Sequence, residues 1–208
     1  MVNKEVVKTS LLSKFYSEIK GKEWIVFTHF IGATQESSSL YYLLRRIYKF
    51  LKPYYTNNDA PSTNNDAPLL DVNKLVQIIK ICLEKSPSTK LLIIIDALNH
   101  LEDKSFYDLD WLPNTLADNI KIIISTLDEG KSKLFLEHKK FVRYRIVLLN
   151  EDECREIVQK IPSIFLKSLN NDQVNKIVNK IVYINKRPNP LYLRVILEEL
   201  RIFGSFFY

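Results

Sequence analysis

Hydrophobic and polar positions in the first 150 residues alternate between strand-like runs and helical spacings. Apolar runs predict four strands, at Trp24–Phe30, Lys90–Leu98, Asn119–Thr126 and Phe141–Leu149, the last with the clearest alternation. The run KLLIIIDAL at Lys90–Leu98 does not alternate, which indicates a strand covered on both faces. Helical spacing occupies residues 8–20, 40–51 and 72–83. Strands separated by helices predict an α/β fold with a mainly parallel sheet.

From Asn150 onward the pattern is entirely helical. Asn150 is a good N-cap for NEDECREIVQKI, whose first turn is acidic, and Pro162 is expected to end that helix. Another helix is predicted around Val174–Ile181, and Asn189 with Pro190 begins a last one that runs to Gly204. We therefore expect an α/β core at 1–149 and a small helical subdomain at 150–208.

Residues 54–69 differ in kind from the rest of the chain. The hexapeptide TNNDAP occurs twice there, at Thr56–Pro61 and Thr63–Pro68. Asn, Asp and Pro do not build a hydrophobic core, so a disordered surface loop is predicted.

Composition narrows the class of protein. The 208 residues carry a net charge of +6, and their basic pairs are scattered, which argues against a nucleic-acid-binding stripe and favours a solvated basic surface. The two cysteines, Cys82 and Cys154, lack metal-ligand spacing and are expected to be reduced thiols of a cytoplasmic protein. No secretory leader or membrane span is expected, because the longest apolar run is short and contains Asp96.

The strongest candidate for chemistry is Asp96 at the end of the LLIIID strand. The carboxyl ends of parallel strands are where α/β proteins bind ligands, and in P-loop NTPases an aspartate there holds magnesium. Ser125 and Thr126 end the next apolar run and could orient a water or a γ-phosphate. The alternatives are structural: Asp96 as a turn or cap residue, and the two hydroxyls as partners of strand-end backbone.

Lys8 and Thr9 stand where a phosphate loop of the form GxxxxGK[ST] would end. A lysine there contacts the phosphates, and Thr9 would ligate magnesium together with Asp96. Val2 and Val7 occupy the glycine positions, however, and no apolar strand precedes Lys8. An ordinary helix start is the alternative interpretation.

Four blocks in order carry a family resemblance: FTHFIGATQESSSLYYLLRRI, LLIIIDALNHLED, DLDWLPNTLADNIKIIISTL and RPNPLYLRVILEELRIFG. Together they resemble the NACHT-type NTPase domain of nephrocystin-like tetratricopeptide proteins, and more broadly the STAND class of AAA+-related signalling ATPases. The resemblance implies a P-loop NTPase-like three-layer αβα core, without its first strand, followed by a helical lid. It implies that Asp96 is the Walker B residue and that Ser125 and Thr126 are sensor-like catalytic positions. It also makes Lys8 and Thr9 relics of a Walker A motif and places Pro190 near the nucleotide base.

The expected function is an ATP- and magnesium-binding switch domain with a degenerate phosphate loop and slow or absent hydrolysis. The alternative is a non-catalytic pseudo-ATPase interaction module, or a protein fragment, with protein partners or a tendency to self-associate. Nucleic-acid binding by the basic surface is a third hypothesis, and it predicts an affinity that falls steeply with salt.

Overall fold

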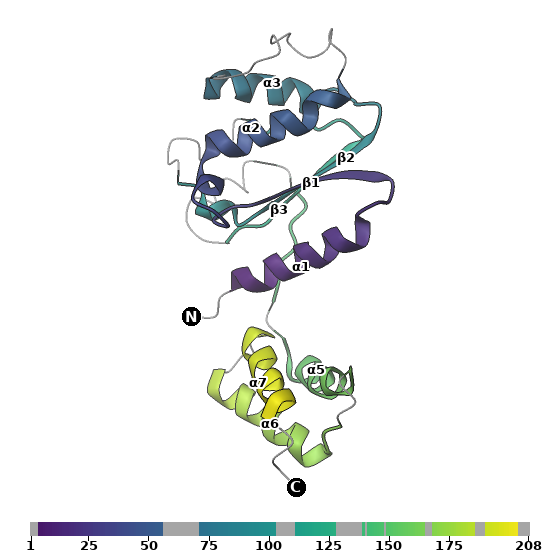
Figure 1. The fold of residues 1–208 in the computed structure, drawn as a ribbon, viewed down its shortest axis with the longest axis vertical. Helices are drawn as coiled ribbons and strands as arrows, with labels where there is room; N and C mark the ends of the chain where they lie inside the picture. Colours follow the sequence, from purple (N-terminus) through teal and green to yellow (C-terminus); the bar gives the residue numbers. More distant parts are fainter. Residues whose placement is uncertain are drawn as a thin grey trace. The chain divides into compact units, whose positions relative to one another are not determined.

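A computed structural model describes residues 4–55, 71–102, 111–127, 139, 141–147, 149–164, 168–185 and 190–203 (Figure 1). The chain divides into two compact units. One comprises Lys8–Arg143, and the other comprises Tyr144–Tyr208 with Met1–Val7. Among the described residues, no helix has the length and apolar character needed to cross a membrane.

The first unit is built on a parallel sheet of three described strands in the order β1-β2-β3. They are β1 (Trp24–Phe30), β2 (Lys90–Asp96) and β3 (Ile120–Ile124), three of the four predicted strands. Because β2 lies in the middle, its residues Leu91–Ile95 are at most 4% exposed. The expected parallel α/β arrangement is therefore confirmed at this level, whereas a P-loop three-layer fold is not.

Helices cover both faces of this sheet (Figure 1). α1 (Lys4–Ile19) lies on one face, where Leu12 packs with Leu92 and Ile94 of β2. α2 (Leu40–Leu51) and α3 (Val72–Glu84) cover the opposite face and form the larger core with Leu91, Ile93 and Ile95. The alternation of β2 side chains between two apolar layers explains why its sequence lacks a polar face.

The described residues of the first unit also form the short 3-10 helices η1 (Glu36–Ser38), η2 (Lys52–Tyr54) and η3 (Leu98–His100). The predicted disordered loop at 54–69 lies outside the described residues from 56 onward. Its first two residues belong to the folded unit, because Tyr54 ends η2 and the Tyr55 hydroxyl donates to the Cys82 and Lys85 carbonyls.

The second unit is helical, with α5 (Glu151–Ile164), α6 (Asn171–Asn185) and α7 (Pro190–Phe203). Its core consists of small and branched apolar side chains: Cys154, Val158, Val174, Val178, Ile181, Leu193 and Leu197. Pro162 lies inside α5, so the prediction that it ends the helix is wrong by two residues. A proline so close to the helix end removes only one backbone hydrogen bond of the last turns.

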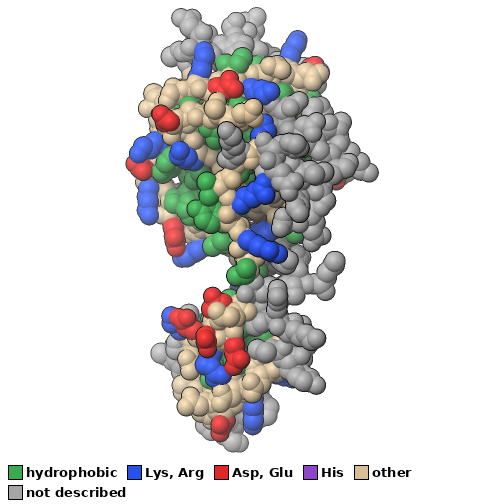
Figure 2. All heavy atoms as spheres, turned by 180° about the vertical axis from the view of Figure 1, so that it is seen from behind, with side chains coloured by type: hydrophobic (Ala, Val, Ile, Leu, Met, Phe, Trp, Pro, Cys, Tyr) green, Lys and Arg blue, Asp and Glu red, His purple; other side chains and the backbone are tan. Residues whose placement is uncertain are grey.

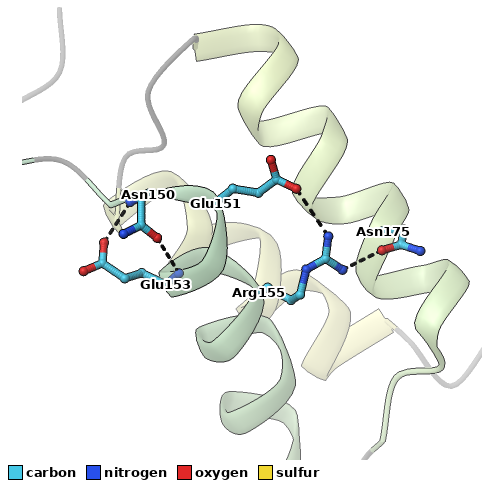
Figure 3. A network of polar contacts seen from close by, with 5 residues as sticks. All are labelled: Asn150, Glu151, Glu153, Arg155 and Asn175. Atoms are coloured by element: carbon cyan, nitrogen blue, oxygen red, sulfur yellow. Dashed lines mark hydrogen bonds and ion pairs between the residues drawn. The ribbon is translucent and has the colours of Figure 1, made fainter.

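Polar contacts fix the start of α5 (Figure 3). The Glu153 amide donates to Asn150 Oδ1 at 2.8 Å, and the Asn150 amide donates to Glu153 Oε2 at 2.8 Å. This reciprocal pair is a capping box, and it satisfies two backbone donors that a helix start leaves open. Arg155 then donates to Glu151 of its own helix at 3.3 Å and to Asn175 of α6 at 2.5 Å.

The predicted strand at Phe141–Leu149 is wrong for the residues that the structure describes. Residues 141–147 have no regular secondary structure, and Val142, Tyr144 and Val147 are 79%, 89% and 74% exposed. Alternation marks a strand only when a neighbouring strand supplies hydrogen bonds, and no described strand does so here.

Candidate functional site

Five of the six predicted site residues lie together at the carboxyl-terminal edge of the sheet. Asp96 ends β2, and Ser125 and Thr126 follow β3. Lys8 and Thr9 lie in the first turns of α1, and their side chains contact this edge. Parallel strands end at the same edge, which is why residues far apart in sequence meet here.

The Asp96 side chain is buried and bonded through both carboxylate oxygens. It is 3% exposed; Thr9 Oγ1 donates to its Oδ2, and Ser125 Oγ donates to its Oδ1. The same Ser125 oxygen accepts the Ala97 amide at 2.9 Å. A buried carboxylate is stable only when hydrogen bonds compensate for its lost hydration, and here two hydroxyls do so.

Lys8 contacts the same edge through the backbone. Its ammonium group donates to the Thr126 carbonyl, which joins α1 to the segment after β3. The Thr126 hydroxyl itself is buried and has no hydrogen-bond partner in the described part of the chain. Lys8 and Thr9 thus attach the same helix to two neighbouring strand ends.

The turn after β2 contains Asn99, a residue that the sequence did not mark as functional. Ala97 adopts a left-handed conformation with φ 58° and ψ 48°, after which the Leu98 amide donates to the Ser125 carbonyl at 2.9 Å. Asn99 then accepts the Leu127 amide on its Oδ1 at 3.3 Å. The sequence DALN does not predict this hydrogen bond of Asn99, because an Asn that faces solvent would give the same sequence.

His29 forms a second polar cluster near the end of β1. It is 1% exposed, its Nε2 lies 2.9 Å from the Ser37 carbonyl, and Arg46 donates to its Nδ1 at 2.6 Å. These partners require a neutral ring with the proton on Nε2. Burial lowers the His29 pKa, with a smaller lowering by Arg46, while the Ser37 hydrogen bond opposes both.

Pro190, the sixth predicted residue, begins α7 in the helical unit and is half-buried there. Its predicted contact with a nucleotide base stays a prediction, because the position of that unit relative to the sheet is not determined.

The backbone before Lys8 does not fit the phosphate loop that a bound ATP would need. α1 is helical from Lys4, so residues 4–7, which would belong to a phosphate loop, form helix instead. A phosphate cradle needs successive backbone amides that are free to point at the ligand, whereas the amide of a residue such as Lys8 belongs to the helical ladder. In the described ranges, no group of three or more His, Cys, Asp or Glu side chains could hold a metal ion.

Comparison with known proteins gives two relatives of low identity. The chain is 23% identical over 118 residues to a TPR repeat-containing protein of Dictyostelium discoideum, which covers 56% of this chain and 7% of that protein. It is 24% identical over 209 residues to "Putative tetratricopeptide repeat protein 41" of Homo sapiens, covering 93% of this chain and 15% of that protein. No protein-family model matches the chain.

These findings overturn the predicted family. No family model supports a NACHT, STAND, AAA+ or P-loop domain, and both relatives are named for tetratricopeptide repeats. The expected ATP- and magnesium-binding switch function is wrong as well, because the relatives are tetratricopeptide repeat proteins. The structure agrees with this correction, since residues 4–7 form helix where a phosphate loop would be needed. The chain is similar to a limited stretch of tetratricopeptide repeat proteins, and it is not identified as an NTPase.

Proposed function

We propose that the chain is a non-catalytic protein-interaction module of a larger protein of the tetratricopeptide repeat type. The names of both relatives support this proposal, because arrays of such repeats form extended surfaces that bind other proteins. The chain spans 7% and 15% of those relatives, and its parallel sheet is not itself a helical repeat. It would therefore act beside the repeats rather than as one of them.

One observation carries the non-catalytic part of the proposal: the Asp96 carboxylate is occupied by the chain's own hydroxyl groups. Each oxygen of this carboxylate, which is 3% exposed, accepts one hydroxyl hydrogen bond, so its lost hydration is compensated without a cation. Lys8 already contacts the Thr126 carbonyl. These contacts attach α1 to the ends of β2 and β3, which makes the cluster a structural joint.

We infer that the layers of helix, sheet and helices serve as a rigid scaffold without a phosphate loop. The partners are then proteins, and ATP and magnesium are not needed. On the face shown in Figure 2, the described Lys and Arg side chains lie among Asp and Glu side chains, which does not favour nucleic acid as the partner. A cytoplasmic location stays an inference from the two unpaired cysteines.

The test measures the molar mass of the purified chain by light scattering as its concentration rises, with and without millimolar ATP and Mg²⁺. We expect the molar mass at each concentration to be the same with and without ATP and Mg²⁺. Lys8→Ala and Asp96→Asn are the matched variants for a nucleotide effect. Binding of ATP with Mg²⁺ by the unmodified chain, abolished in both variants, would contradict the proposal.

A further inference from the structure

The outward backbone groups of β1 and β3, the two outer strands of the described sheet, differ in their hydrogen bonding. In β1, the Ile31 amide donates to the Asp96 carbonyl at 3.1 Å, so the odd-numbered residues turn their backbone groups toward β2. The even-numbered residues turn outward, and the outward carbonyl of Thr28 accepts a hydrogen bond from Arg46 at 3.2 Å. Arg46 comes from α2 and also lies over the Phe27 ring, 5.2 Å from its centre. A cation thus protects the β1 edge, as natural sheets often arrange.

The β3 edge has no such protection in the described part of the chain. The Leu91 amide donates to the Asn119 carbonyl at 2.8 Å, and the Ser125 amide donates to the Ile95 carbonyl at 2.9 Å. Odd-numbered residues of β3 therefore face β2, and Ile122 and Ile124 turn their amides and carbonyls outward. No described strand or side chain pairs with these groups.

The side chains of β3 are also only partly covered. Ile122, Ile123 and Ile124 are each half-buried, although the paired strand β2 is almost fully buried. Ile122 and Ile124 pack against the core under α2 and α3, whereas Ile123 packs on the α1 side. A strand added at this edge would therefore find apolar contacts on both of its faces.

We propose that β3 pairs with β3 of a second copy, antiparallel about a two-fold axis, so that two sheets join into one. This deepens the proposed function by naming the surface and the partner. A two-fold axis at Ile122 sets it opposite its own copy, where the two residues exchange two backbone hydrogen bonds. It also sets Ile120 opposite Ile124, where the Ile124 amide donates to the partner's Ile120 carbonyl, because the Ile120 amide already donates to the Ala117 carbonyl at 2.9 Å.

The sequence of β3 is compatible with pairing to a second copy of itself. Lys121, the one charged residue in IKIII, falls opposite Ile123 in this register, so like charges do not face each other. The assembly also closes at a dimer, because the other outer edge of the three described strands is the β1 edge, where Arg46 donates to the Thr28 carbonyl. Each copy carries a net charge of +6, so moderate salt should strengthen the association by screening long-range repulsion.

Amide hydrogen exchange, resolved by residue with NMR, tests the proposal on the unmodified chain. Exchange at Ile122 and Ile124 should slow by about fivefold when the chain is at ten times its dissociation constant, because only the monomer exposes these amides. Lys121 and Ile123 are internal controls on the same strand, since their amides bond to β2 in monomer and dimer alike. These two amides should be protected even at low concentration, where the amides of Ile122 and Ile124 exchange freely.

Two variants give a second readout by sedimentation velocity. Ile122→Lys places like charges opposite each other at the proposed axis and should leave a monomer, while Ile25→Lys, at a 38% exposed isoleucine on β1, should still associate. Circular dichroism establishes that both variants fold. Association without slowed exchange at Ile122 and Ile124 would overturn edge pairing and leave the interaction module standing. A monomer at every concentration would also overturn the pairing, whereas the proposed function is contradicted by ATP binding.

Discussion

The hydrogen bond between Thr9 and Asp96 can be removed with almost no change in shape by Thr9→Val. Valine replaces the hydroxyl with a methyl group, so α1 keeps its packing while Asp96 Oδ2 loses its donor. Asp96 is 3% exposed, and water cannot replace that donor without opening the site. A hydrogen bond to a charged group contributes about 1.5–3 kcal/mol, and we expect the free energy of unfolding to fall by that amount.

Urea unfolding, followed by circular dichroism, measures this change, and Thr9→Ser is the matched control because it keeps the hydroxyl. The expected order of stability is unmodified chain, then Thr9→Ser, then Thr9→Val. A ligand-binding site makes the opposite prediction, since functional groups held in place for an absent ligand often reduce stability. A Thr9→Val chain that unfolds at the same urea concentration as the unmodified chain would refute the structural joint.

Three further predictions concern stability. Burial holds the His29 pKa below its ordinary value of 6.5, so the unfolded chain takes up a proton at a higher pH than the folded chain does. The free energy of unfolding should therefore fall as the pH drops from 6.5 toward the pKa of the folded chain. His29→Gln should remove that part of the pH dependence, as measured by urea titrations. Asn150→Ala removes the capping box of α5 and should cost about 1 kcal/mol, measured as a lower thermal midpoint of the helical unit; an unchanged midpoint would exclude a role for the cap. Leu44→Ala, at a fully buried position, should cost about 2–5 kcal/mol, whereas Leu11→Ala, at a 55% exposed position, should cost less than about 1 kcal/mol; equal costs would contradict the described core.

Much of the fold follows from the sequence because burial repeats at regular spacing. Leu40–Leu51 is found as α2 and Trp24–Phe30 as β1 with the predicted bounds, since each carries a complete periodic pattern. The segment 141–149 shows where this reasoning fails. Its alternation is typical of a strand, but a strand also needs a neighbour, and alternation within one segment says nothing about whether a neighbour exists.

The sequence indicates which residues meet at the candidate site, but it does not indicate what their hydroxyl groups bind. The order of the strands places Asp96 beside Ser125, and the lysine and threonine of α1 were identified from a motif. Whether those hydroxyls serve a metal or the carboxylate itself depends on the backbone before Lys8, where helix replaces loop. The Arg46 contact with His29 was missed because residues 17 positions apart on different elements leave no local pattern.

The unfolding free energy with and without ATP and Mg²⁺ tests the central claim most directly. A ligand that binds only the folded chain raises that free energy by about 2.7 kcal/mol when it is present at one hundred times its dissociation constant. We expect no change at millimolar ATP and Mg²⁺, because Thr9 and Ser125 already bond to Asp96 and α1 leaves no phosphate loop. A rise in the unfolding free energy that Asp96→Asn abolishes would contradict this account.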